Sequence, residues 1–288
     1  MNNISHLLGH KGKMAIAVTR EAYYAGDSIE ATVTLTVEQD LKVEEVYVEL
    51  LGVAKYEHVE EGISSFSQIP EYHREKKILA SKSTIKAGSP YVYEATLKIP
   101  KYTPPTYHGN VISIKWLIKA SCDIRLEWDI SAELEIPVLI ERPRQAPEAN
   151  DNIVEVTTDN CTLSLSLSEV AIVEGETVHA LLTVKPSNHF IASEMWAEVI
   201  LFEDIPTAAG YKRKWIEQKI PIISKTQFET GLAQSFSFDM TIPAMYTPTI
   251  QTVGFTAEWQ LKAIVSRHMH SSYEIIKPFT VYSSATYS

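Results

Sequence analysis

His268 and His270 are the clearest pair of potential metal ligands in the sequence. Alternate residues of a strand share one face, so both imidazoles could approach a single cation. A third ligand is missing, because the nearby carboxylate of Glu274 has no position fixed relative to the pair. A solvated histidine pair is the simpler interpretation, and we predict neither a metal site nor a cofactor.

Hydroxyl and carboxylate side chains gather around residue 60, but not in an arrangement that activates a nucleophile. No nucleophile elbow or fixed base accompanies them. The residues considered are Glu60, Glu61, Ser64, Ser65 and Ser67, together with Asp27. Paired carboxylates of the glycosidase kind meet only in space, so the sequence leaves that chemistry open. We predict no catalytic residues and no enzymatic activity.

Pro104-Pro105-Thr106-Tyr107 matches the PPxY pattern that WW domains bind as a polyproline II segment. The second half of the chain has a related stretch, Tyr246-Thr247-Pro248-Thr249-Ile250, which lacks the motif. What the two stretches share is a proline-containing turn before a strand. We therefore interpret the prolines as structural, and leave open whether the motif is ever a WW ligand.

The overall composition bounds the class of protein. A chain of 288 residues has room for about two domains, and 45% hydrophobic with 22% charged residues is typical of a folded globular protein. A net charge of −10 gives no basic excess to drive binding to nucleic acid or to an anionic membrane surface. The sequence contains neither a signal peptide pattern nor a run of about 20 apolar residues. We expect a cytoplasmic protein without membrane insertion, with Cys122 and Cys161 reduced.

Period-two alternation of apolar and polar residues is the main structural signal. It runs from Ile29 to Val37, where apolar residues alternate with Glu and Thr, and it returns from Val46 to Leu50 and from Leu163 to Leu167. No stretch shows sustained helical periodicity, and turn signals such as Gly26-Asp27 separate the strands. The sequence predicts an all-β fold of two immunoglobulin-like antiparallel β-sandwich domains in tandem.

A proline-containing stretch interrupts this alternation near the middle of the chain. Pro143 and Pro147 fix the backbone and remove amide donors, which is typical of an extended linker. We predict an N-terminal domain over residues 1–142, of which 1–12 are flexible. A linker over 143–152 and a C-terminal domain over 153–288 follow it.

An internal repeat supports this division. The motif around Trp116 returns around Trp259, 143 residues later, each time followed by Lys-Ala and preceded by an Ile-Pro turn. The turn at Gly26 has a counterpart at Gly175, and an alternating strand follows each turn. The two halves are therefore expected to share one topology.

These motifs resemble the arrestin family in its broad sense. That group includes classical arrestins, the α-arrestins, the retromer small adaptor subunit and the bacterial sporulation-control proteins. The resemblance rests on Tyr24-Ala25-Gly26-Asp27-Ser28-Ile29, on the strand Val46-Tyr47-Val48-Glu49-Leu50-Leu51-Gly52, and on Ile99 to Ala120. It covers nearly the whole chain, and it implies an adaptor fold without naming a partner.

The sequence departs from classical arrestins at two places. Those proteins use an arginine on a strand near the domain hinge in a phosphate-sensitive polar core, but the strand from Thr162 to Ser168 has no arginine. A phosphate-triggered latch is therefore not expected. The chain also stops at Ser288, shortly after Tyr282, so we expect no long regulatory tail.

Two segments are candidate partner-binding sites. Residues 58–72 break the alternation, and we expect a long loop that presents Ile63, Phe66 and Ile69 among polar residues, at the position of the receptor-contacting loop of arrestins. The second is Lys212-Arg213-Lys214, a basic cluster beside Trp215 in an acidic chain. A hairpin without function and a solvated strand end are the respective alternatives.

The sequence thus favours a non-enzymatic cytoplasmic adaptor or scaffold that binds a protein partner through loops and concave sheet faces. A ligand-binding or carbohydrate-active β-sandwich protein is the alternative. No nucleic-acid partner is expected. Self-association through exposed sheet edges is left open.

Overall fold

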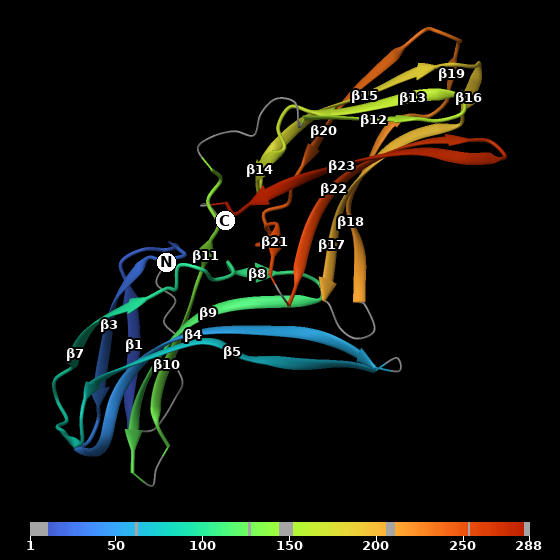
Figure 1. The fold of residues 1–288 in the computed structure, drawn as a ribbon. Helices are drawn as coiled ribbons and strands as arrows, with labels where there is room; N and C mark the ends of the chain where they lie inside the picture. Colours follow the sequence, from blue (N-terminus) through green and yellow to red (C-terminus); the bar gives the residue numbers. More distant parts are fainter. Residues whose placement is uncertain are drawn as a thin grey trace. The chain divides into compact units, whose positions relative to one another are not determined.

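The computed structural model describes residues 11–60, 63–125, 128–143, 152–205, 211–252 and 254–284. Strands make up 70% of the structure and helices 0%, which confirms the all-β prediction. The chain divides into two compact units, Met1–Ile140 and Glu141–Ser288. Figure 1 shows that strands build both units.

The first unit is a sandwich of a three-stranded and a larger antiparallel sheet. The smaller sheet has the order β1-β3-β7, and the larger has the order β10-β9-β4-β5 with β6 on β4 and β8 on β9; β2 pairs with β11 in parallel. Their bounds are β1 Gly12–Val18, β2 Tyr23–Tyr24, β3 Ser28–Val37, β4 Leu41–Glu60, β5 Ile63–Ala80, β6 Ser83–Ile85, β7 Tyr91–Lys98, β8 Tyr107–His108, β9 Ile112–Ile124, β10 Ile130–Ile136 and β11 Val138–Leu139.

The second unit repeats this plan. One sheet has the order β12-β13-β15-β20, the other β14-β23-β22-β17-β18 with β21 on β22, and β16 pairs with β19. Their bounds are β12 Ile153–Thr157, β13 Cys161–Leu167, β14 Ala171–Val173, β15 Thr177–Pro186, β16 Phe190–Ala192, β17 Glu194–Ile205, β18 Tyr211–Ile223, β19 Thr226–Phe228, β20 Gln234–Thr241, β21 Ile250–Gln251, β22 Thr256–Arg267 and β23 His270–Tyr282.

The period-two residues build the core of each unit. Every apolar position that alternates in β3, from Ile29 to Val37, is buried, and so are Leu163, Leu165 and Leu167 in β13. Residues between them face outward because successive side chains of a strand point to opposite faces. Burial of these apolar faces between two sheets is the main stabilising contribution to a sandwich.

Hydrogen bonds at equivalent positions confirm the internal repeat. The Trp116 indole donates to the Pro104 carbonyl at 3.2 Å, and the Trp259 indole donates to the Thr247 carbonyl at 2.8 Å. Each acceptor stands 12 residues before its tryptophan. The two halves therefore repeat local geometry as well as strand order.

The predicted glycine turns are also repeated. Gly26 and Gly175 have φ values of 90° and 87°, a conformation that side chains with a Cβ rarely adopt. The next residue caps each turn: the Asp27 carboxylate accepts from the Tyr24 amide at 3.0 Å, and the Glu176 carboxylate accepts from the Val173 amide at 2.8 Å. Glycine is thus required by the backbone at both turns.

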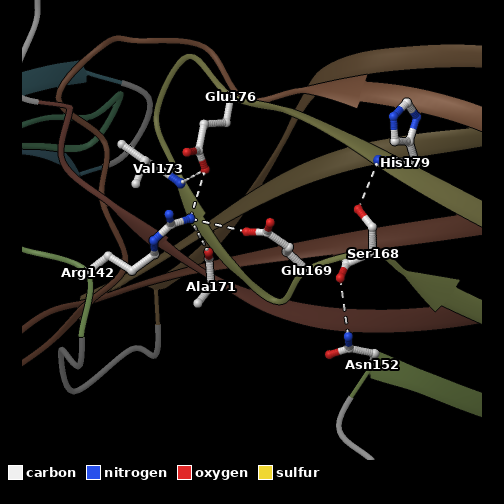
Figure 2. A network of polar contacts seen from close by, with 8 residues as sticks. All are labelled: Arg142, Asn152, Ser168, Glu169, Ala171, Val173, Glu176 and His179. Atoms are coloured by element: carbon white, nitrogen blue, oxygen red, sulfur yellow. Dashed lines mark hydrogen bonds and ion pairs between the residues drawn. The ribbon is translucent and has the colours of Figure 1, made fainter. Parts of the chain in front are cut away.

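Arg142 fastens the start of the second unit to its own glycine turn, as Figure 2 shows. Its Nη1 donates to the Glu169 carboxylate at 3.1 Å, the Ala171 carbonyl at 3.2 Å and the Glu176 carboxylate at 3.2 Å. In the first unit, Arg20 makes the corresponding contact with Asp27 at 2.9 Å. Arg142, which we placed in the first domain from the sequence, bonds instead within the second unit.

Asn152 adds a second contact near the same turn, because its side-chain amide donates to the Ser168 carbonyl at 3.3 Å (Figure 2). Residues 144–151 of the predicted linker lie outside the described residues. β11 is the last strand of the first unit, so the chain leaves that unit after Leu139 and contacts the second at Arg142.

We propose that the two units fold separately, and limited proteolysis is the test. Each unit has its own core, so we expect early cleavage within residues 143–152 and two fragments that resist further digestion. Mass spectrometry of the first fragments would locate the cuts. Early fragments that end inside residues 29–50 or 236–263 would contradict this boundary, because those residues form core strands.

Candidate functional site

Residues 58–72 do not form the long loop expected from the sequence. β4 continues to Glu60, β5 begins at Ile63, and the two strands pair from Glu60 opposite Ile63 back to Val46 opposite Ala80. The polar, serine-rich sequence hid this because the alternation that marks a half-buried strand is absent where a strand is not packed against a core.

The outer part of this hairpin extends past its own sheet. The pairing of β4 with β9 ends at Tyr56 opposite Ile112, so among the described residues, 57–60 and 63–66 pair only with each other. Figure 1 shows the long hairpin of β4 and β5. We call residues 57–66 the arm. An isolated two-stranded ribbon is marginally stable in water, so the fold of the unit does not need these residues.

The base of the arm is fixed by Tyr72. β5 has an irregularity opposite Val53, where the register shifts between Gly52 and Ala54. Tyr72 lies within this irregularity, next to His73, which pairs with Gly52. Its ring packs edge-on against Trp116, with ring centroids 5.4 Å apart. The residue is 37% exposed overall, and the partial burial of its ring raises the pKa of Tyr72. The base of the hairpin is thereby anchored to the core tryptophan.

Gly52 makes room for this ring. A Cβ at position 52 would lie 2.5 Å from Cε2 and 2.7 Å from Cζ of Tyr72, closer than real contacts allow. An isolated glycine within a strand pattern indicates a bulge or a close approach of another group to the backbone. At Gly52 the approaching group is the ring of Tyr72. In the sequence, Gly52 stands out only as the last residue of the strand motif Val46-Tyr47-Val48-Glu49-Leu50-Leu51-Gly52.

We expect Gly52→Ala to destabilise the first unit by about 1–3 kcal/mol, the usual cost of overpacking. The added methyl must displace Tyr72, whose ring is held between position 52 and Trp116. Gly254→Ala is the matched control, because a Cβ at position 254 would meet no atom within 4 Å. Urea unfolding followed by fluorescence measures both variants. Equal midpoints for the two would contradict the packing account.

The register places the three proposed contact residues. Ile63 and Phe66 belong to the arm and Ile69 follows it in β5, so we call residues 57–69 the arm region. Ile63 stands opposite Glu60, Phe66 opposite Glu57 and Ile69 opposite Ala54. Backbone alternation assigns positions 63 and 69 to one face of the ribbon and position 66 to the other. The side chains of residues 56–70 lie outside the described part of the structure, so their role as partner contacts stays a prediction.

The basic cluster lies on the edge strand β18 and is divided between two faces. Lys212 stands opposite Asp204, Arg213 opposite Glu203 and Lys214 opposite Phe202. Because side chains alternate along a strand, position 213 belongs to the face opposite that of positions 212 and 214. Each of the three residues stays a candidate contact.

Lys214 is engaged with its neighbour in β17. Its ammonium lies 3.2 Å from the Glu198 carboxylate, which also accepts from the Trp196 indole at 3.1 Å. Burial raises the pKa of Glu198, but these two hydrogen bonds outweigh it and leave the pKa below its usual value. A charged ligand at Lys214 would have to compete with Glu198.

The outer faces of the two large sheets carry a matching arrangement. The Lys76 ammonium from edge strand β5 lies 3.8 Å from the centroid of the Tyr47 ring, and that of Lys219 from edge strand β18 lies 4.5 Å from the Trp196 ring. Tyr47 and Trp196 are equivalent in the repeat. Lysines on an edge strand discourage pairing with another sheet. These two edges are therefore protected.

The PPxY motif is part of the core. Pro105, Thr106 and Tyr107 are buried. The Thr106 amide donates to the Val138 carbonyl at 2.7 Å, and its hydroxyl accepts from the Val138 amide at 2.9 Å. Thr249 and Val281 repeat both bonds in the second unit at 2.8 and 2.9 Å. These contacts support the structural interpretation of the prolines.

Chemical sites are not assembled among the described residues. No group of three or more His, Cys, Asp or Glu side chains there could hold a metal ion, and His268 and His270 are exposed. Both cysteines are free and buried, and burial is the main cause that raises the pKa of Cys122 to about 11, which disfavours a thiolate. Trp116 and Trp259 are buried and form no open aromatic groove.

Comparison with known families agrees with this architecture. Residues 10–143 match the family model described as Arrestin (or S-antigen), C-terminal domain. The first unit is an arrestin-like domain. The family model is that of a C-terminal domain, yet it matches the first unit. This is expected when the two units share one topology. None of the curated proteins matches the chain closely enough to count as a relative.

The match to the arrestin-like superfamily bears on function at a coarse level. Its members are typically non-enzymatic adaptors that bind proteins. Within the described ranges, the chain has no helix long and apolar enough to cross a membrane.

Proposed function

We propose that this arrestin-like protein is a cytoplasmic adaptor or scaffold that binds a protein partner through the arm of β4 and β5. The observation that supports the proposal is the extension of this hairpin beyond its sheet, since within the described part of the hairpin residues 57–60 and 63–66 pair only with each other. A ribbon that the fold does not require, yet that is anchored through Tyr72 to Trp116, is suited to present side chains to another molecule.

The composition of the arm region supports a protein partner. Ile63, Phe66 and Ile69 supply apolar anchors, while serines and a glutamine between them supply adaptable hydrogen bonding. Positions 63 and 69 are on one face of the ribbon and position 66 is on the other, so we expect the partner to contact both faces. Lys212, Arg213 and Lys214 are proposed as a second, weaker contact.

A cytoplasmic location is part of the proposal. Cys122 and Cys161 are both free, and one lies in each unit, so the fold uses no disulfide between them. Free buried cysteines are typical of proteins that fold in a reducing compartment.

Changing Ile63, Phe66 and Ile69 together to Ser tests the arm. We expect thermal unfolding within about 1 kcal/mol of the parent, the range for positions that pack against no core, and loss of the principal partner in affinity capture from the native cell. Quantitative mass spectrometry would compare the captured proteins.

A matched control removes three apolar side chains elsewhere. Tyr102, Trp128 and Met269 are 99%, 95% and 91% exposed, so changing them together to Ser removes the same number of apolar side chains outside the arm region. We expect this control to retain the partner. Equal recovery by the parent and both triple variants would reject the arm as the contact. Unfolding of the arm variant alone would place its residues in a core.

A further inference from the structure

The outer strand of one sheet in the second unit, β12, leaves a row of backbone groups without partners. The turn after β12 is closed by the Thr158 amide, which donates to the Cys161 carbonyl at 2.8 Å. In an antiparallel ladder every second residue bonds to the neighbouring strand. Counting back from Thr158 gives Val156 and Val154 facing β13. The N–H and C=O groups of Ile153, Glu155 and Thr157 therefore point away from β13, and they meet no acceptor or donor within the described ranges.

Four other sheet edges, those of β5, β7, β18 and β20, are closed or charged. At the edge of β7, the Lys98 amide donates to the Glu75 carboxylate at 2.7 Å. At the equivalent edge of β20, the Thr241 amide donates to the Gln218 side chain at 3.3 Å. Strand β5 carries Lys76 over its outer face, and β18 carries several basic residues and a proline. β12 has no lysine, arginine, proline or bulge.

The side chains of β12 define what could pair with it. Ile153 and Val156 are 51% and 39% exposed although both are apolar. Val154 and Val156 stand opposite Leu165 and Leu163, so they share the face of the buried core. Glu155, opposite Ser164, is on the outer face with Ile153 and Thr157. An added strand would place its residues alternately beside the two valines and beside Glu155.

We propose that β12 binds an extended peptide segment of a partner by strand addition, and that this segment carries a Lys or Arg between two apolar residues. The basic residue would stand opposite Glu155, and the apolar residues opposite Val154 and Val156. The outward N–H and C=O groups of three residues offer the peptide backbone hydrogen bonds, which supply affinity. The alternation of valines and Glu155 along β12 supplies specificity. This surface is in the second unit and is independent of the arm.

A peptide fits this edge better than a second copy of the chain. Two β12 strands could pair about a two-fold axis. The register that uses all three outward residues then sets Glu155 against Glu155, and like charges directly opposite each other are destabilising. A five-residue strand pair also buries much less than the roughly 1,000 Å² of a stable interface. A basic segment of an extended peptide removes the charge repulsion, and a weak peptide complex does not need the area of a stable dimer.

The probe is the capped peptide acetyl-Thr-Val-Lys-Val-Thr-amide, titrated into the full-length protein at low salt up to about 1 mM while backbone amide NMR signals are followed. We expect slowed hydrogen exchange at the amides of Ile153, Glu155 and Thr157. A peptide whose backbone amide nitrogen is methylated at the lysine keeps the side-chain charge but loses a backbone donor. This peptide should not bind.

Charge reversal identifies the partner of the lysine. For Glu155→Lys, we expect affinity for the lysine peptide to fall about fivefold and affinity for the glutamate analogue to rise about fivefold, the size of a reversed cross-strand charge pair. Glu94→Lys makes the same charge change in the first unit and should alter neither. Thr157→Pro, which removes an outward N–H together with the hydroxyl contact to Thr162 at 3.2 Å, should weaken both peptides.

The proposal fails if the lysine peptide causes no shifts at β12, or if binding persists with N-methylation and is indifferent to Glu155→Lys. Concentration-dependent dimerisation of the free protein that Thr157→Pro abolishes would instead assign this edge to a second copy and overturn the peptide proposal. Sedimentation velocity measures that outcome.

Discussion

Replacing Tyr107 by Ala should cost about 3–5 kcal/mol of stability, the usual effect of deleting a large buried aromatic side chain. Tyr107 is fully buried and pairs with Ile114 at the start of the large sheet of the first unit. Ile250 is buried at the equivalent place in the second unit, so this position serves the core in both halves.

Tyr102→Ala is the matched control for this prediction. Tyr102 lies five residues upstream and is 99% exposed, so its loss should change stability by no more than about 0.5 kcal/mol. Denaturant unfolding measures both variants, and WW-domain capture is recorded alongside. Unchanged melting of Tyr107→Ala together with lost WW capture would show that the motif is a ligand and that its burial is wrong.

Trp259→Ala should destabilise the second unit by a similar amount, about 3–5 kcal/mol. Trp259 is buried, lies 6.3 Å from the ring of Phe279 and donates its indole N–H to Thr247. Trp259→Phe should cost less, because it keeps most of the apolar volume. Some cost remains, since the Thr247 carbonyl loses its hydrogen bond.

Trp128→Ala, in the hairpin loop between β9 and β10, is the control for this second prediction, since Trp128 is 95% exposed. Hydrogen exchange resolved by residue separates the units. We expect Trp259→Ala to weaken protection in β17, β22 and β23 while β3, β4 and β9 keep theirs. Equal loss of protection in both units would contradict separate cores and the proposed domain independence.

Features that depend on a packed face were predictable from the sequence. The alternation in β3 and β13 reports burial directly, because one face of each strand meets the core, and it predicted the all-β sandwich correctly. The tryptophan repeat was predictable for the same reason. Trp116 and Trp259 are both buried and both donate to a carbonyl 12 residues upstream, so residues around them recur.

Features that depend on unpacked or distant groups were not predictable. The arm looked like a loop because strands without a buried face lose their periodic signal. The role of Arg142 was missed because its acceptors at Glu169 and Glu176 are separated from it in sequence by the whole linker. Strand geometry divides neighbouring residues between two faces, so the sequence alone did not show that position 213 lies on the other face from positions 212 and 214.

Site-specific photocrosslinking tests the central proposal most directly. A photoreactive phenylalanine analogue would replace Phe66 in one version of the protein and Tyr102 in another, and both would be irradiated in the native cell. The arm proposal predicts a covalent adduct with the principal partner from position 66 and none from position 102. Adducts of equal yield from both positions, or no adduct at 66 while affinity capture of that partner persists, would contradict it.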